Sequence, residues 1–187
     1  MRLGIFGGTF DPIHLAHLRV AEEVASALDL DRVVFVPAGH PPHRPKPRAT
    51  AQERLAMVCL AIAGNPRFAV TDLETRRRGP SYTVDTLREL RRRLGGERLV
   101  LILGADAASQ LPRWRAADEV ARLAEIAVLT RPGVPEVASA FVKHLVATPA
   151  IEISASDIRA RCLTGKSIRY LVPDAVADYI ATHRLYQ

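Results

Sequence analysis

Two short segments of the sequence combine glycine, histidine, serine and arginine in patterns that suit phosphate binding. The first, residues 7–17, reads GGTFDPIHLAH and follows a short apolar run. Its glycines allow the backbone to approach a ligand closely, and the helix that begins there offers unpaired N–H groups. His14 and His17 are three residues apart, so both lie on one face of the first turn and can contact one anion. We expect His17 to face the ligand and to pack against little.

The second segment, residues 153–159, reads ISASDIR. It places hydroxyl groups at the end of a predicted strand and Arg159 in the first turn of a predicted helix. Hydroxyl, backbone N–H and guanidinium groups together suit a polyphosphate. Both segments begin helices at the carboxyl ends of predicted strands, where open parallel sheets bind their ligands. Together they predict two phosphate contacts in one crevice.

Each segment also has a purely structural interpretation. Gly7 and Gly8 could form only a tight turn between a strand and a helix. The two histidines could bind zinc, although no cluster of cysteines or carboxylates supplies further ligands. In the second segment, Ser156 could cap its helix, and Asp157 could form an i,i+4 ion pair with Arg161. Residue types alone leave these alternatives open.

Short apolar runs alternate with longer amphipathic stretches, which is typical of a parallel sheet covered by helices on both faces. We expect strands at residues 3–6, 33–36, 68–70, 99–103, 126–129 and 150–153. Helices are expected at about 15–28, 51–63, 83–94, 156–163 and 173–183. The sequence therefore predicts an α/β fold with a doubly wound parallel sheet. We expect one domain over residues 1–187, with a core over about 1–153 and a small C-terminal helical segment over about 154–187.

The composition is that of an ordinary globular domain, with 48% hydrophobic and 25% charged residues, and it excludes a disordered or collagen-like chain. The net charge of +6 indicates anionic ligands. No apolar run has the roughly 20 residues of a membrane-spanning helix, so we expect a cytoplasmic protein with no membrane partner. Cys59 and Cys162 are predicted to be small core hydrophobes in a reducing compartment. Five prolines predict an exposed, semi-rigid loop over residues 37–48.

The two phosphate segments resemble the GGTFDPIHxGH and ISSxxIR signatures of the HxGH nucleotidyltransferase superfamily. The chain resembles the bacterial nicotinate-nucleotide adenylyltransferase family over nearly its whole length, from residue 3 to residue 186. Residues 41–44, 80–87, 104–106 and 111–114 carry this narrower resemblance. Ala16 stands where the family has glycine, and Ala155 stands where it has a second serine. The methyl group of Ala16 would tighten the approach of the helix to a nucleotide.

The resemblance implies a Rossmann-like fold and the reaction of ATP, with Mg²⁺, and nicotinate mononucleotide, without a dedicated metal site on the protein. It implies that three residues act on the ATP phosphates: His14, His17 and Arg159. Further ATP contacts would come from Gly7, Gly8, Thr9, Phe10, Ser154 and Ile158. Contacts to the mononucleotide would come from Thr83, Asp106, Trp114 and Arg115, with the indole stacked on the pyridine. Phosphate contacts from the proline-rich loop would come from His43, Arg44 and Lys46.

Several of these residues also have simpler interpretations. Trp114 could be a partly buried core residue, and Asp106 could cap a helix. The arginine triplets at residues 76–78 and 91–93 are similar to nucleic-acid patches, but the second lies on the polar side of a predicted helix. A solvated face explains it better, and no nucleic-acid partner is expected. The first triplet could steer anions to the site.

Two other functions compete with this interpretation. Pantetheine-phosphate adenylyltransferases share both phosphate motifs, although residues 81–83 and 111–114 favour the nicotinate substrate. A non-catalytic nucleotide sensor or RNA-binding protein could use the same fold and the same basic charge. A pure nucleic-acid binder would have no need of His14, His17 and Arg159. Oligomeric state has no signal in the sequence.

Overall fold

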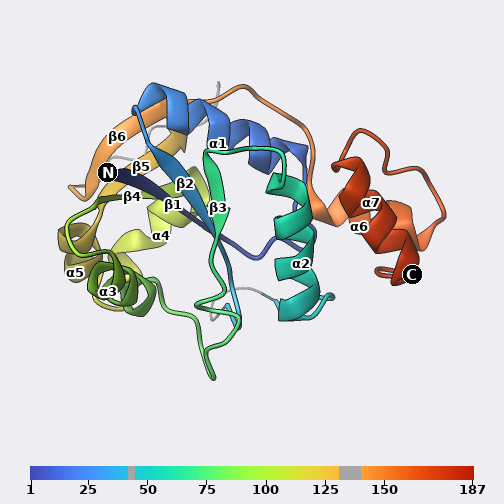
Figure 1. The fold of residues 1–187 in the computed structure, drawn as a ribbon, viewed down its shortest axis with the longest axis horizontal. Helices are drawn as coiled ribbons and strands as arrows, with labels where there is room; N and C mark the ends of the chain where they lie inside the picture. Colours follow the sequence, from blue (N-terminus) through green and yellow to red (C-terminus); the bar gives the residue numbers. More distant parts are fainter. Residues whose placement is uncertain (42–44, 131–139) are drawn as a thin grey trace.

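The computed structural model describes residues 1–41, 45–130 and 140–187, and a parallel sheet forms the centre of this part (Figure 1). Its six strands are β1 (Arg2–Gly8), β2 (Arg32–Pro37), β3 (Phe68–Val70), β4 (Arg98–Gly104), β5 (Glu125–Thr130) and β6 (Val142–Ala147). They pair in the order β3-β2-β1-β4-β5-β6, and every pair is parallel. The chain order reverses between β1 and β4, the position at which such sheets bind ligands. The predicted doubly wound sheet is confirmed.

Helices cover both faces of the sheet. They are α1 (Leu15–Ala27), α2 (Ala51–Ile62), α3 (Thr83–Leu94), α4 (Ala105–Gln110), α5 (Ala117–Leu123), α6 (Ala155–Leu163) and α7 (Asp174–Thr182), with a 3-10 turn at Leu111–Arg113. Val24 of α1 and Met57 of α2 belong to one buried cluster, while Leu87 of α3 and Val120 of α5 belong to another. The two clusters lie on opposite faces. No helix in the described ranges is long and apolar enough to cross a membrane.

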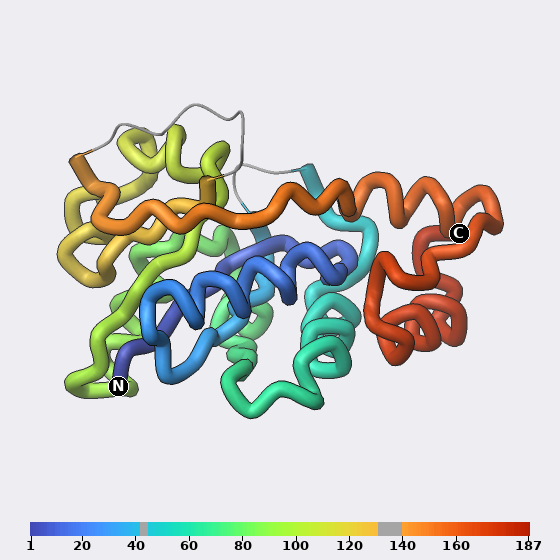
Figure 2. Tube along the Cα trace, turned by 90° about the horizontal axis from the view of Figure 1, so that it is seen from above, coloured from blue at the N-terminus to red at the C-terminus, as the bar shows by residue number. Residues whose placement is uncertain are grey.

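The C-terminal segment packs on the sheet domain through α7. Figure 2 shows this segment at one end of the molecule, beside α2. Val176 and Ile180 of α7 are buried in the same cluster as Met57 of α2. The backbone N–H of Leu15, at the start of α1, donates to the carbonyl of Leu171 at 2.9 Å. The C-terminal segment thus contacts the start of α1, where His14 and His17 lie.

One predicted strand is wrong. The last strand is β6 at Val142–Ala147, and residues 150–153 have no regular structure. β6 is an edge strand with partly exposed polar residues, among them Lys143 and His144, so it lacks the continuous apolar run of an inner strand. The short helices α4 and α5 were not predicted because six or seven residues are too few to display a helical period.

The prediction for Cys59 is also wrong, because Cys59 is exposed. Cys162 is partly buried and packs against the first core cluster, so its prediction holds in part. The buried residues of α2 are Arg54, Met57, Val58 and Ile62, and Cys59 lies just beyond this stripe. On α6 the buried residue is Ile158, and Cys162 lies four residues later near the exposed end of the helix.

Candidate active site

The loop between β1 and α1 brings the two histidines together as predicted. Phe10 has a positive φ of 50°, and His14 is the N-cap residue of α1. The backbone N–H of His14 donates to Nδ1 of His17 at 3.3 Å, so the side chain of His17 caps its own helix. The two imidazole rings stack with their centroids 3.7 Å apart.

His17 is more tightly packed than the sequence predicts. Its ring lies edge-on to Phe10 and Phe6, at centroid distances of 5.1 and 6.3 Å. The expectation that it packs against little is therefore wrong, because Phe6 of β1 and Phe10 of the following loop pack against its ring. Burial, and then the nearby His14, hold the pKa of His17 well below its ordinary value. Since Nδ1 accepts the backbone N–H, neutral His17 carries its proton on Nε2.

The second phosphate segment reaches the first through Arg159. Its Nη1 donates to the main-chain oxygen of Asp11 at 2.7 Å, although 148 residues separate the two in sequence. Ser154, rather than Ser156, caps α6, and its hydroxyl accepts the N–H of Asp157 at 3.2 Å. The expected ion pair of Asp157 with Arg161 is present at 2.7 Å. The segment therefore has both a structural cap and an arginine directed to the first loop.

Asp11 is the buried residue at which these segments meet. Its Oδ2 accepts the N–H of Arg48 at 2.8 Å, and its Oδ1 accepts the N–H of Ala49 at 3.1 Å. Oδ1 also accepts the hydroxyl of Tyr186 at 2.8 Å, and Nη1 of Arg159 lies 4.0 Å from Oδ2. Asp11 thus connects the first loop, the residues before α2, α6 and the end of the C-terminal segment.

Arg54 is a second buried polar residue that the sequence analysis missed. It is 1% exposed, and it donates to the carbonyls of Thr9 at 2.6 Å, Gly39 at 3.2 Å and Ala49 at 3.4 Å. Burial lowers its pKa, and the negative charge of Asp11 opposes this shift. One guanidinium thereby joins the loop after β1 to both ends of the connection between β2 and α2. The sequence does contain a signal for this role, because Arg54 lies in the apolar stripe of a predicted helix.

The proline-rich segment is described only in part. His43 and Arg44 lie outside the described residues, and Lys46 is exposed. The start of the segment is fixed by Ser81, whose hydroxyl accepts the N–H groups of Gly39 and His40 at 3.2 Å each. Residue 39 must be glycine, since a Cβ there would clash with the carbonyl of Glu74.

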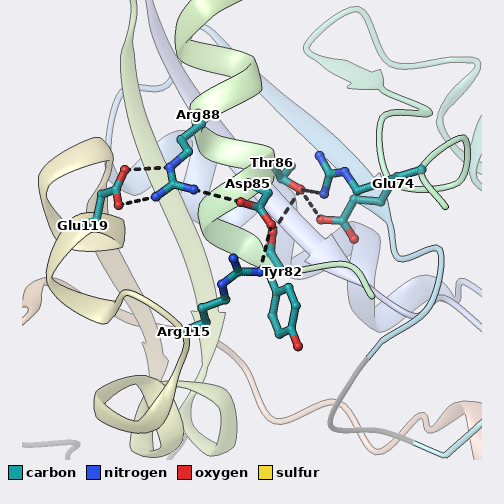
Figure 3. A network of polar contacts seen from close by, with 8 residues as sticks. Glu74, Tyr82, Asp85, Thr86, Arg88, Arg115 and Glu119 are labelled. Atoms are coloured by element: carbon teal, nitrogen blue, oxygen red, sulfur yellow. Dashed lines mark hydrogen bonds and ion pairs between the residues drawn. The ribbon is translucent and has the colours of Figure 1, made fainter. Parts of the chain in front are cut away.

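A polar network fixes the first turn of α3 (Figure 3). Arg88 donates to both carboxylate oxygens of Glu119, at 2.7 and 2.6 Å, and to Asp85 at 3.0 Å. Arg115 lies 4.8 Å from the centre of the Tyr82 ring and 3.7 Å from Asp85. These contacts join the start of α3 to the segment after the 3-10 turn.

The same helix is held from its other side by a buried carboxylate. The hydroxyl of Thr86 donates to Glu74 at 2.7 Å, as Figure 3 shows, and accepts from Arg77 at 3.1 Å. Burial raises the pKa of Glu74, and its hydrogen bond from Thr86 and the charge of Arg77 oppose this rise. Ser81, which accepts the N–H groups of Gly39 and His40, lies directly before Tyr82, the N-cap residue of α3. The start of α3 is therefore also connected to the start of the proline-rich segment.

The other predicted site residues differ in how far their side chains are exposed. Thr83 is the first residue of α3, and Trp114 is half-buried against the second core cluster. Asp106 is exposed in the first turn of α4, where Gly104 is the N-cap, so Asp106 is not the capping residue. The side chain of Ile158 is fully buried. Gly7 and Gly8 end β1.

The arginine triplet at residues 91–93 is engaged in local contacts. Arg91 donates to the carbonyls of Leu123 and Glu97, at 2.7–2.9 Å. Arg92 and Arg93 both pair with Glu89 at 2.7 Å. The triplet therefore stabilises α3 and its surroundings, as the solvated-face interpretation predicts. Within the described ranges, no group of three or more histidine, cysteine, aspartate or glutamate side chains is placed to hold a metal ion.

The fold and the paired phosphate segments define a nucleotide-binding α/β protein of the nucleotidyltransferase class. The family model described as cytidylyltransferase-like matches residues 5–161. Relatives named as probable nicotinate-nucleotide adenylyltransferases include one of Thermomicrobium roseum, 47% identical over all of this chain and 92% of its own. One of Thermus thermophilus is 46% identical over the whole of both chains. The chain belongs to the cytidylyltransferase-like family and, within it, to the nicotinate-nucleotide adenylyltransferases.

Solved structures agree on the fold. A Plasmodium falciparum nicotinic acid mononucleotide adenylyltransferase complexed with NaAD has a TM-score of 0.80 and covers 99% of this chain and 97% of its own, at 17% identity. A Vibrio parahaemolyticus structure named as a nicotinate-nucleotide adenylyltransferase has a TM-score of 0.71 at 20% identity, and covers 100% and 96% of the two chains. The predicted Rossmann-like architecture is confirmed.

Proposed function

We propose that the protein transfers the adenylyl group of ATP to nicotinate mononucleotide, giving nicotinate adenine dinucleotide and pyrophosphate in NAD biosynthesis. The observation that carries this proposal is the 2.7 Å hydrogen bond of Arg159 to Asp11, which joins the two phosphate segments at the reversal point of the sheet. Full-length relatives of this chain bear the corresponding name.

In this reaction a phosphate oxygen of the mononucleotide attacks the α-phosphorus of ATP. The bond between that phosphorus and the oxygen that bridges to the β-phosphorus breaks, and pyrophosphate leaves with the electron pair. Such chemistry needs positioning and charge stabilisation rather than a protein nucleophile. Neutral His17 donates its Nε2 proton in a hydrogen bond to a phosphate oxygen, beside His14. Arg159 and the hydroxyl of Ser154 hold the β- and γ-phosphates.

The acceptor binds at the start of α3 and beside the 3-10 turn. The helix N-terminus at Thr83 favours the nicotinate carboxylate through its N–H groups. The half-buried indole of Trp114 supplies a stacking surface for the pyridine ring, and the exposed Arg115 adds positive charge. The carboxylate of Asp106 is exposed at the end of β4, where it can accept hydrogen bonds from a ribose.

Mg²⁺ enters this proposal with the ATP phosphates. The donor set of the two phosphate segments consists of imidazole, hydroxyl and guanidinium groups, whereas Mg²⁺ prefers oxygen ligands in an octahedral arrangement. The residues therefore suit a metal held by phosphate oxygens, which neutralises the charge of the triphosphate. The residues of this chain would orient that complex through Arg159, Ser154 and the two histidines.

Pyrophosphate release tests the proposal. The purified protein is given Mg-ATP with nicotinate mononucleotide, nicotinamide mononucleotide or phosphopantetheine in parallel. Release with the first acceptor alone is the expected result. A preference for either other acceptor would reject the roles of Thr83 and Trp114, and no release from folded protein would reject the enzymatic function.

A further inference from the structure

Tyr186 is the residue that the proposed mechanism leaves unexplained. It follows α7 and is 7% exposed, with its ring in the same buried cluster as Ile13 and Ile158. Its backbone has a φ of 65°, the left-handed region that tyrosine rarely adopts. Its hydroxyl donates to Oδ1 of Asp11 at 2.8 Å, across 175 residues of sequence. A strained backbone thus directs a buried hydroxyl to the first phosphate segment.

Asp11 lies between this hydroxyl and Arg159. The carboxylate accepts three neutral donors, and Nη1 of Arg159 donates to the main-chain oxygen of the same residue at 2.7 Å. Nη1 of Arg159 and Oδ2 of Asp11 form only a long ion pair, at 4.0 Å, and the Arg159 side chain is 26% exposed. Arg54, another cation near Asp11, is held by three carbonyl oxygens. Among the residues that the structure describes near Asp11, Arg159 is therefore the cation that the carboxylate can attract.

We propose that Tyr186 is a positioning residue for Arg159: by donating to Asp11, its hydroxyl keeps the long ion pair between the guanidinium and that carboxylate from closing, and so keeps the guanidinium available to the phosphates of ATP. The inference rests on the proposed function, which assigns Arg159 to those phosphates. Without the hydroxyl, the buried Oδ1 of Asp11 loses a donor, and a closer ion pair with Arg159 compensates for the loss. Burial and the charge of Asp11 raise the pKa of Tyr186, so the hydroxyl stays protonated.

The test compares Tyr186→Phe with Tyr179→Phe. Each removes one hydroxyl from the C-terminal segment, but Tyr179 stacks on His183 at 4.0 Å and does not contact Asp11. Calorimetric titration with Mg-ATP, without acceptor, should show roughly five- to tenfold weaker binding for Tyr186→Phe, as expected for one buried hydrogen bond. KM for nicotinate mononucleotide should stay at the wild-type value. Tyr179→Phe should bind ATP as wild type does.

A double-mutant cycle separates positioning from a structural role. In an Arg159→Ala background, Tyr186→Phe should cause no further loss of ATP affinity, because the residue through which it acts is gone. Wild-type ATP affinity in Tyr186→Phe, or the same loss in both backgrounds, would overturn the inference while leaving the proposed function intact. Wild-type ATP affinity in Arg159→Ala would overturn both the inference and the proposed role of Arg159. Thermal unfolding of all four proteins establishes that each is folded.

Discussion

At the scale of single residues, His17 has two roles that a substitution can separate. Its Nδ1 caps α1 by accepting the N–H of His14, and its Nε2 proton is proposed to contact phosphate. His17→Ala should lower turnover by about 100- to 1000-fold. It should also lower the free energy of unfolding by about 1–2 kcal/mol, because the cap and the contacts with Phe6 and Phe10 are lost.

His17→Asn is the matched control for this prediction. Asparagine can accept the N–H of His14 through Oδ1, but it has no group at the position of Nε2. Urea unfolding should give a stability between those of wild type and His17→Ala, because the cap is kept while the ring contacts with Phe6 and Phe10 are lost. The turnover, measured as pyrophosphate release, should be as low as in His17→Ala. Near-normal turnover in either variant would remove His17 from the mechanism.

Trp114 tests the acceptor site at the same scale. Trp114→Ala should raise KM for nicotinate mononucleotide roughly tenfold or more, as for loss of one aromatic stacking contact, and leave KM for ATP unchanged. Trp114→Phe, which keeps a smaller stacking surface, should lie between wild type and the alanine variant. Because the indole is half-buried, both variants need a thermal unfolding control. An equal rise in KM for both substrates would assign Trp114 to the core.

At the scale of elements, Ser81 joins the start of the proline-rich segment to α3. Ser81→Ala leaves the N–H groups of Gly39 and His40 without their acceptor in a buried position. The free energy of unfolding should fall by about 1–3 kcal/mol in urea titrations. Ser26→Ala, at an exposed position of α1, should change it by no more than about 0.5 kcal/mol. Equal effects of the two substitutions would refute the assigned role of Ser81.

The sequence predicts the elements well where one pattern dominates. Inner strands such as β2 and β4 are continuous apolar runs, and α3 has a clear apolar stripe, so their positions follow from periodicity. The edge strand β6 mixes polar and apolar residues, and its pattern resembles a loop. Motif spacing also brings His14 and His17 together, because three residues in a helix fix their geometry.

The contacts that hold the site in place have no such pattern. Arg54 donates to three carbonyl groups, and any residue type can supply a carbonyl. Tyr186 and Asp11 are 175 residues apart in the sequence, and no local pattern in a single sequence indicates that two such distant residues are in contact. The residues proposed to act in the reaction thus lie in local motifs, whereas the residues that position them emerge only from the tertiary structure.

At the scale of the whole molecule, charged side chains connect the strands at the end of the sheet opposite the site. Glu125, at the start of β5, accepts hydrogen bonds from Lys143 of β6 at 2.7 Å and from Arg2 of β1 at 3.0 Å, and it lies 2.8 Å from His144. These contacts, that of Lys143 first, lower the pKa of Glu125 from 4.5 to about 2. One carboxylate thus connects the first strand of the chain with the last two.

Because the pKa of Glu125 is lower in the folded protein than in the unfolded chain, its stabilising effect is complete above about pH 4.5 and is lost as the pH falls toward about 2. Glu125→Gln should lower the free energy of unfolding at pH 7 by about 1 kcal/mol, since solvent screens part of the interaction. The difference from wild type should shrink as the pH falls, in urea titrations at pH 7, 5 and 3. Asp178→Asn, an exposed acid on α7, should leave the pH dependence of wild type intact. A constant difference between Glu125→Gln and wild type at all three pH values would show that the side chain stabilises the sheet by packing and not by its charge.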